Sequence, residues 1–228
     1  MSKNFNGKLA AIIIAVAVIA DQALKIWVKT HFYYGEELDI TSWFKLVFIE
    51  NNGMAFGMEL GSKFLLTWFR IIAVCAFVYY LYRIRNRADL QRGYVACVAL
   101  ITAGALGNVI DCIFYGVAFN DPPFTGVAQL FPPDGGYGTL FNGRVVDMIY
   151  LPLASWDWPS WMPMVGGEHF VFFQPIFNVA DACLSVSVVV LILFYSHNIS
   201  GSLDSAHAAG GDNDGGDNDG GDTQQQDK

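Results

Sequence analysis

The sequence is poor in charge and lacks any grouping of cysteine or histidine that is typical of a metal site. Only 15% of its 228 residues are charged, whereas 54% are hydrophobic, and this is little charge for a water-soluble domain. Its four cysteines form no C-x-x-C pair and its four histidines are scattered, so we expect no metal and no other cofactor. No basic patch with interleaved aromatic residues occurs, and we therefore expect no nucleic-acid partner.

The hydrophobic residues fall into long runs of about 20 residues, the length that a helix needs to cross a bilayer. These runs predict spans at about 9–29, 64–82, 93–115 and 177–196. We therefore predict an all-α membrane protein: a four-helix membrane domain over residues 1–200, with a small β-rich and irregular periplasmic part. A cleaved signal peptide is an alternative for the first run, although that run resumes after Asp21.

Basic residues predict the orientation of these spans, because lysine and arginine gather in cytoplasmic loops. Four arginines lie between residues 83 and 92, and Lys3 and Lys8 precede the first span. Both termini are then cytoplasmic, and segments 30–63 and 116–176 are periplasmic. The first segment contains a β-favouring stretch at 44–49, and the second is rich in Gly, Pro and Trp, which predicts irregular structure near the membrane interface.

The chain changes character after residue 200. Residues 201–228 contain Gly/Asp-rich repeats with almost no apolar side chains, and such a segment cannot bury enough surface to fold. We predict a disordered cytoplasmic tail. A calcium-binding repeat is an alternative, but the period is five residues rather than nine.

Carboxylates inside the apolar runs are the strongest indication of chemistry. Placing an aspartate at the centre of a span costs about 2.5–3.5 kcal/mol, yet Asp21, Asp111 and Asp181 all lie in predicted spans. The predicted orientation places these three carboxylates, and that of Asp147, near the periplasmic face. Single roles are also open, since Lys25 is spaced to pair with Asp21 and Asp181 is placed to cap a helix.

Two aspartates that share a proton can act as general acid and general base on a water molecule, as in aspartyl proteases. A serine or cysteine nucleophile would need a base, and no histidine lies near these carboxylates in the sequence. The alternative from another class is a proton-coupled transporter with a carboxylate relay. The sequence shows no internal repeat of the kind common in transporters, and no G-x-G-D motif of presenilin-like proteases.

Five short motifs occur in order along the chain. They are D-Q-x-x-K from Asp21, N-N-G-M-A-F-G from Asn51, G-A-L-G-N-V-I-D ending at Asp111, V-V-D ending at Asp147, and F-N-V-A-D ending at Asp181. In this order, over roughly residues 10–195, the sequence resembles lipoprotein signal peptidase (signal peptidase II), an aspartyl endopeptidase family. Each motif alone is weak evidence for the family, whereas all five in this order, together with four spans, are specific to it.

The resemblance implies an enzyme of the bacterial inner membrane with its active site near the periplasmic face. Its substrates would be diacylglyceryl prolipoproteins, cut just before the lipidated cysteine, in contact with membrane lipids. Globomycin-type cyclic peptides would inhibit it. The implied catalytic pair is Asp147 and Asp181. The implied supporting residues are Asp21, Lys25, Asn51, Gly53, Asn108, Asp111 and Asn178.

The sequence departs from the family at Cys112, where an arginine usually follows the aspartate. We expect another cation to supply that charge, with Arg144 as the candidate because it lies three residues before Asp147. The segments on both sides of Asp147 are also longer than usual in the family, and they form either a larger lid or a tolerated insertion.

Overall fold

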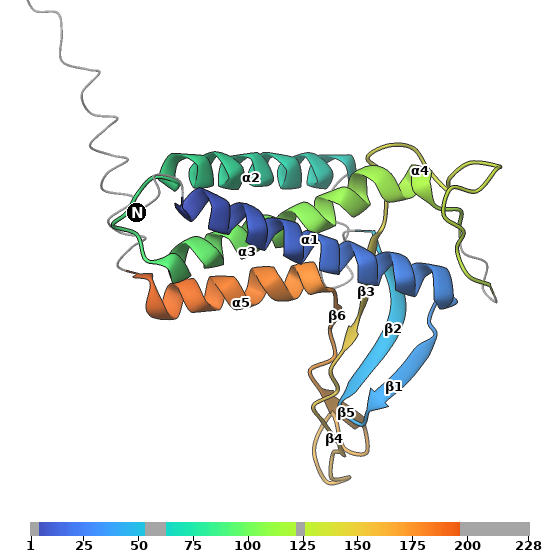
Figure 1. Ribbon diagram of the computed structural model, residues 1–228. Coiled ribbons are helices and arrows are strands. Elements are labelled where there is room, and N and C mark those ends of the chain that lie inside the picture. The colour runs from blue at the N-terminus through green and yellow to red at the C-terminus, as the bar shows by residue number, and fades with distance from the viewer. Residues whose placement is uncertain (1–4, 53–62, 122–125, 197–228) are drawn as a thin grey trace, which may run out of the picture.

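The computed structural model describes residues 5–52, 63–121 and 126–196. Its body is a bundle of long helices, with all strands toward one end (Figure 1). The long helices are α1 (Phe5–His31), α2 (Lys63–Ile84), α3 (Arg92–Ile110) and α5 (Val179–Phe194). Helix α3 continues through a π-helical turn, η1 (Asp111–Tyr115), into the short helix α4 (Gly116–Ala118).

The composition of the helices fits a membrane. Three helical stretches are long and apolar enough to cross a bilayer, at 6–31, 63–84 and 92–118, and α5 is a shorter apolar helix of 16 residues. Large apolar side chains point outward from the bundle, among them Ile19, 67% exposed, and Phe69, 68% exposed. Each predicted span thus coincides with an apolar helix, and such outward faces suit lipid rather than water.

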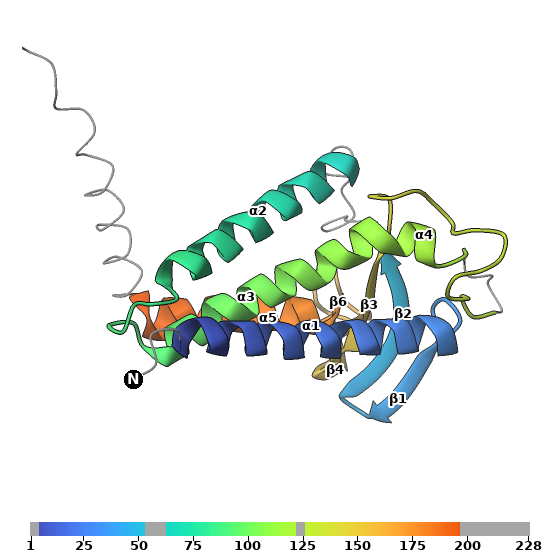
Figure 2. The ribbon, with the colours of Figure 1, turned by 45° about the horizontal axis from the view of Figure 1, so that its top comes forward.

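Helix α3 is the centre of the bundle. It packs against α1, α2 and α5, and Figure 2 shows α2 on one side of it and α1 and α5 on the other. Close packing of α3 on α5 depends on glycine: a Cβ atom at Gly104 would lie 2.3 Å from the carbonyl oxygen of Ala180. Small residues permit such close approach of two helix backbones.

We predict that Gly104→Ala destabilises the protein by about 1–3 kcal/mol, the usual cost of overpacking a core, because the backbones of α3 and α5 must separate. Gly138→Ala is the matched control, since the nearest atom to its added Cβ is 3.7 Å away. Thermal unfolding of both variants in detergent measures the effect. Equal unfolding midpoints for the two variants would show that close packing at Gly104 does not determine the stability of the protein.

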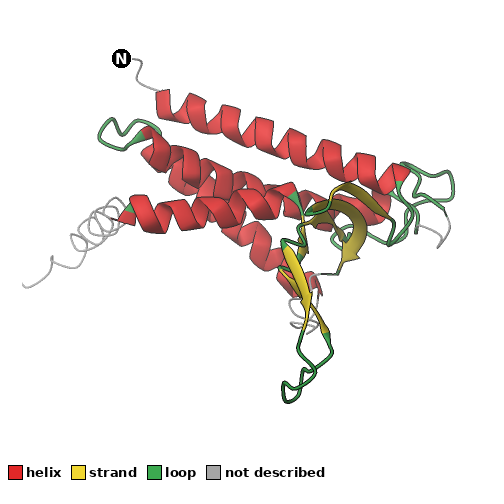
Figure 3. Cartoon of the chain, turned by 90° about the horizontal axis from the view of Figure 1, so that it is seen from below, coloured by secondary structure: helices red, strands yellow, loops and turns green. Residues whose placement is uncertain are grey.

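The strands form two antiparallel sheets (yellow in Figure 3). One has the order β1-β2-β3-β6, built from Glu37–Thr41, Phe44–Asn51, Val145–Tyr150 and Ile176–Phe177. The other pairs β4 (Ala154–Asp157) with β5 (His169–Phe172). The strand predicted at 44–49 is confirmed. The expectation of irregular structure over 116–176 is wrong for β3, β4 and β5, because pairing with distant strands orders segments whose Gly, Pro and Trp content obscures any alternation.

The four-stranded sheet packs on the end of the bundle through one apolar cluster. Val28 from α1, Phe48 from β2, Phe119 after α4, and Val146 and Met148 from β3 are all buried there. Because side chains alternate across a strand, Asp147 faces away from its neighbours Val146 and Met148. The packing of β3 therefore fixes the direction of the Asp147 carboxylate.

The start of α1, the α2–α3 connection and the end of α5 lie together at the end of the bundle opposite the strands (Figure 1). This arrangement agrees with helices that alternate in direction. The predicted site residue Gly53 and the predicted tail at 201–228 lie outside the described residues.

Candidate active site

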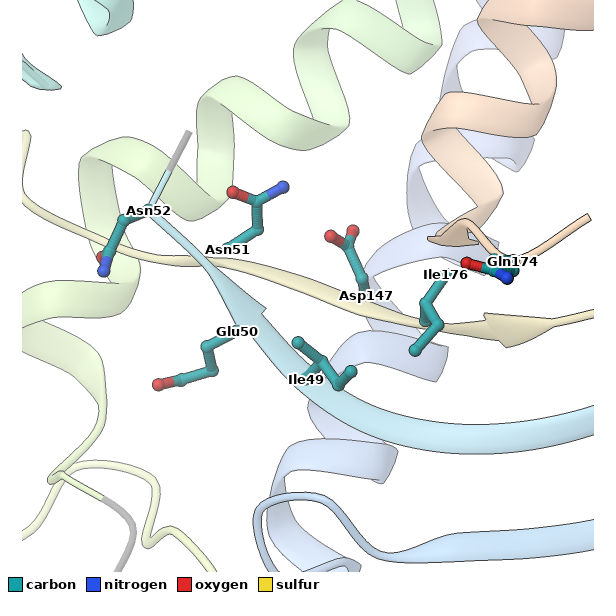
Figure 4. A pocket seen from close by; sticks show the side chains of 7 residues that line it. All are labelled: Ile49, Glu50, Asn51, Asn52, Asp147, Gln174 and Ile176. Carbon is teal, nitrogen blue, oxygen red and sulfur yellow. The ribbon is translucent and has the colours of Figure 1, made fainter. Parts of the chain in front are cut away.

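Asp147 lines a pocket beside the four-stranded sheet. The pocket has a volume of about 390 Å³, and its lining residues are Ile49, Glu50, Asn51, Asn52, Asp147, Gln174 and Ile176. In Figure 4 the side chains of Asp147 and Asn51 extend to the same side of their strands, and that of Glu50 points away from them. The amide of Asn51 also hydrogen-bonds Asp147. Asp147 is only 6% exposed, so its carboxylate is a mostly desolvated group at the pocket wall.

Asp181 lies in the first turn of α5, where the chain leaves β6. Asn178 is the N-cap, and its Oδ1 accepts a hydrogen bond of 2.9 Å from the Asp181 backbone N–H. The Asp181 carboxylate in turn accepts from the Asn178 backbone N–H at 3.4 Å. This reciprocal capping box confirms the cap role that the sequence left open for Asp181. It leaves the other carboxylate oxygen, Oδ1, directed at Asn108.

Two asparagine amides connect Asp147 to Asp181. The Nδ2 of Asn178 donates to Asp147 Oδ1 at 2.7 Å, and also lies 3.1 Å from Asn108 Oδ1. The Nδ2 of Asn108 donates to Asp181 Oδ1 at 2.8 Å. Asn178 is fully buried, and buried amides hold their geometry because unpaired polar groups are costly. The two carboxylates thus belong to one fixed hydrogen-bond network.

Lys25 connects this network to two further buried aspartates. Its Nζ lies 2.9 Å from Asp21 Oδ2, 2.8 Å from Asp111 Oδ2 and 2.9 Å from Asn108 Oδ1, so each of its three N–H groups has an acceptor. Lys25, Asp21 and Asp111 are all at most 1% exposed. The predicted pairing of Asp21 with Lys25 is confirmed, and the structure adds Asp111 as the second anion. One buried cation therefore compensates two buried carboxylates.

Asp21 and Asp111 also hold the backbone next to Asp181 and Asp147, respectively. Asp21 Oδ1 accepts from the N–H of Ala180 at 2.9 Å, one residue before Asp181. Asp111 Oδ2 accepts from the N–H of Val146 at 3.3 Å, one residue before Asp147. The ion cluster around Lys25 thus fixes both segments, β3 and the start of α5, against the helix bundle.

The structure adds polar residues that the sequence did not identify as part of the site. Gln22 donates to Asp111 Oδ1 at 2.8 Å and accepts from the Tyr115 hydroxyl at 3.0 Å. A fully buried Lys29 pairs with Glu50. A spacing of four residues from Asp21 through Lys25 to Lys29 places all three on one face of α1, and this signal in the sequence would have identified Lys29.

The candidate for the charge missing at Cys112 lies elsewhere. Arg144 pairs with Glu50 at 2.9 Å and with Asp121 at 2.6 Å. The guanidinium that contacts Cys112 is that of Arg70 from α2, whose Nη1 donates to the Cys112 sulfur at 3.1 Å. A cation therefore lies beside Cys112, but it is Arg70 of α2 rather than Arg144, which lies just before β3.

The carboxyl group of Asp147 is hard to ionise in this pocket. Burial, followed by the charge of Asp181, raises the pKa of Asp147 to about 7, although hydrogen bonds from Asn178 and Asn51 oppose the shift. A carboxyl group with this pKa exchanges its proton near neutral pH. Within the described part of the chain, no group of three His, Cys, Asp or Glu side chains is placed to hold a metal ion.

The sequence is similar to those of known proteins. Residues 13–197 match the family model of signal peptidase (SPase) II. The chain is 46% identical over 204 residues to the lipoprotein signal peptidase of Porphyromonas gingivalis (strain ATCC 33277), and the match covers 90% of each protein. It is 35% identical over 184 residues to the lipoprotein signal peptidase of Amoebophilus asiaticus (strain 5a2), covering 78% of this chain and 73% of that protein.

The fold also has solved relatives. A bacterial membrane enzyme determined by the in meso method at 1.9 Å resolution matches with a TM-score of 0.55 and 25% identity, over 85% of this chain and 97% of that one. A second such structure, at 2.3 Å resolution, matches with a TM-score of 0.57 and 24% identity, over 87% and 93%. With a family model that matches most of its length and apolar helices suited to a bilayer, the chain belongs to the signal peptidase II family of membrane proteases.

Proposed function

We propose that this chain is an aspartic endopeptidase that removes the signal peptide from diacylglyceryl-modified prolipoproteins, cutting just before the lipidated cysteine. The observation that carries the proposal is the network in which Asn108 and Asn178 join Asp147, at a pocket wall, to Asp181. The substrate class follows from the names of the relatives, which are lipoprotein signal peptidases. A transporter, the alternative raised by the sequence, does not account for membership in a protease family.

In the proposed reaction, Asp147 and Asp181 share one proton, because two nearby carboxylates cannot both ionise cheaply in a partly buried site. The ionised member takes a proton from water, whose oxygen attacks the carbonyl carbon of the scissile peptide bond. The protonated member donates to the departing nitrogen as the C–N bond breaks. The proton belongs to the pair, so the acid and base roles are assigned to the pair as a whole.

The supporting residues have positioning roles in this proposal. Lys25 neutralises Asp21 and Asp111, which hold the backbone beside Asp181 and Asp147 respectively. Asn51 extends the wall of the pocket next to Asp147. Arg144 holds Glu50, another lining residue, from the opposite side of β2. Groups that orient reacting residues in this way are commonly as important as the residues themselves.

The proposed topology places four spans in the inner membrane, with the strands and the pocket at the periplasmic face and both termini in the cytoplasm. We expect a reporter enzyme that is active only in the periplasm to be active when fused near Gly126 and inactive when fused near Asn86. The reason is that basic residues gather on the cytoplasmic side. Arginines surround Asn86, whereas Arg144 is the only lysine or arginine in segment 116–176. The reverse pattern would place the pocket in the wrong compartment.

The function is tested with a matched pair of precursor peptides that differ only in whether the cysteine carries diacylglycerol. We expect the purified enzyme to cleave the lipidated peptide, to release a product that begins with the modified cysteine in mass spectra, and to leave the other peptide intact. A globomycin-type cyclic peptide should block the reaction. Equal cleavage of both peptides, or a cut at another bond, would contradict the proposed specificity.

A further inference from the structure

The hairpin formed by β4 and β5 stands apart from the rest of the protein. It forms its own two-stranded sheet and projects sideways from the bundle in Figure 1, and Figure 3 shows its loop extending beyond the helices. None of the residues from 151 to 177 is buried. Because an isolated two-stranded hairpin is marginal in water, a further surface is needed to stabilise it.

The two faces of the hairpin differ in chemistry. Residues paired across antiparallel strands share a face, and the pairs Trp156–Phe170 and Ala154–Phe172 alternate with Ser155–Val171 and Asp157–His169. The Trp156 and Phe170 rings lie 4.7 Å apart, and the Trp158 ring lies against both. One face is therefore aromatic. The other carries Ser155 opposite Val171, and an Asp157–His169 pair at 2.7 Å.

The loop at the end of the hairpin is apolar and uncovered. Trp161 is 78% exposed and Met164 is 98% exposed. The segment 151–175 contains no lysine or arginine, so attraction to anionic groups does not explain this surface. Tryptophan beside aliphatic side chains is typical of groups that enter the interfacial region of a bilayer.

The position of the hairpin favours the bilayer as the surface that it contacts. Only residues 173–175 separate β5 from β6, and β6 leads directly into α5, so the base of the hairpin lies where an apolar helix begins. The hairpin extends to the side of the bundle at that level, rather than along the helix axes (Figure 1). The surface of the hairpin therefore lies beside the bundle, at the boundary of the lipid.

We propose that the aromatic face and loop of the β4–β5 hairpin insert into the leaflet that borders the strands, as a lipid anchor outside the helix bundle. The inference rests on the proposed membrane-spanning bundle and goes beyond the proposed activity. Gln174 and Ile176, which follow the hairpin, line the pocket beside Asp147. Anchoring the hairpin therefore holds one wall of the pocket at the lipid surface, where a lipid-modified substrate is embedded.

The test uses the full chain in phosphatidylcholine nanodiscs, with the four native cysteines replaced by alanine and one new cysteine carrying an environment-sensitive NBD fluorophore. Met164→Cys places the label in the apolar loop. Ser155→Cys is the matched control, on the polar face of the same hairpin. We expect blue-shifted emission and quenching by brominated lipid at position 164, and quenching by aqueous iodide at position 155. High salt should change neither signal.

Equal iodide quenching at the two positions would overturn the proposal, and so would protection of position 164 that appears only after a lipidated peptide is added, which would indicate a substrate contact. A second measurement keeps the native cysteines and compares brominated-lipid quenching of tryptophan fluorescence in the wild type and Trp161→Phe. The anchor requires a smaller quenched fraction in the variant, and an unchanged fraction would contradict it. Neither readout needs catalysis, so failure here is distinguishable from failure of the proposed function.

Discussion

Replacing either Asp147 or Asp181 by asparagine is expected to abolish nearly all cleavage, by about 10³-fold or more, because members of a catalytic pair act as a unit. Asparagine keeps the size of the side chain and removes the titratable group. The double variant should be little worse than either single one. The lipidated precursor should still bind, since Asp147 is only one of the seven residues that line the pocket.

The measurement is the cleavage rate of the purified variants at equal concentration, with Asp157→Asn as control. Asp157 lies on the exposed hairpin, and its loss should leave the rate close to that of the wild type. Substantial turnover by Asp147→Asn or Asp181→Asn would remove that residue from the pair. Asp111 would then be the next candidate, because it belongs to the same buried network.

Replacing Lys25 by methionine is expected to have the largest effect on stability, about 3–5 kcal/mol, the usual cost of leaving a buried charge without its partner. The variant would leave Asp21 and Asp111 without their cation. Because these carboxylates hold the backbone beside Asp181 and Asp147, activity should fall with stability. Thermal unfolding in detergent and the cleavage rate of the folded fraction measure both effects.

Lys8→Met is the matched control, since Lys8 lies on the same helix and is exposed. A second variant distinguishes charge from packing: adding Asp111→Asn to Lys25→Met removes one of the two carboxylates left without a partner. We expect the double variant to be more stable than Lys25→Met alone. If it is less stable, the role of Lys25 is packing or hydrogen bonding rather than charge compensation.

The helices and the polar positions could be predicted from the sequence because both signals are local. Apolar runs locate the helices, and aspartates inside those runs are costly enough to indicate a site. The pairing of Asp21 with Lys25 and the capping role of Asp181 follow from spacing alone. Those features need no knowledge of which segments meet in space.

The rest of the site depends on contacts between distant segments. Pairing of β2 with β3 places Asn51 and Asp147 on one pocket wall, and no local pattern gives that register. The amide bridge needs Asn108 of α3 beside Asn178 at the start of α5, and this contact depends on the close packing at Gly104. Arg70 contacts Cys112 from another helix, so neighbours in sequence could not identify it.

The pH dependence of kcat/KM for a lipidated precursor tests the shared proton most directly. Burial and the charge of Asp181 raise the pKa of Asp147 to about 7, so the pair holds its proton below neutral pH and loses it as the pH rises through about 7. We expect a bell-shaped profile whose alkaline limb falls near pH 7, since two ionised carboxylates leave no acid for the departing nitrogen. Activity that stays constant or increases from pH 6 to 9 would contradict a pair of aspartates sharing one proton.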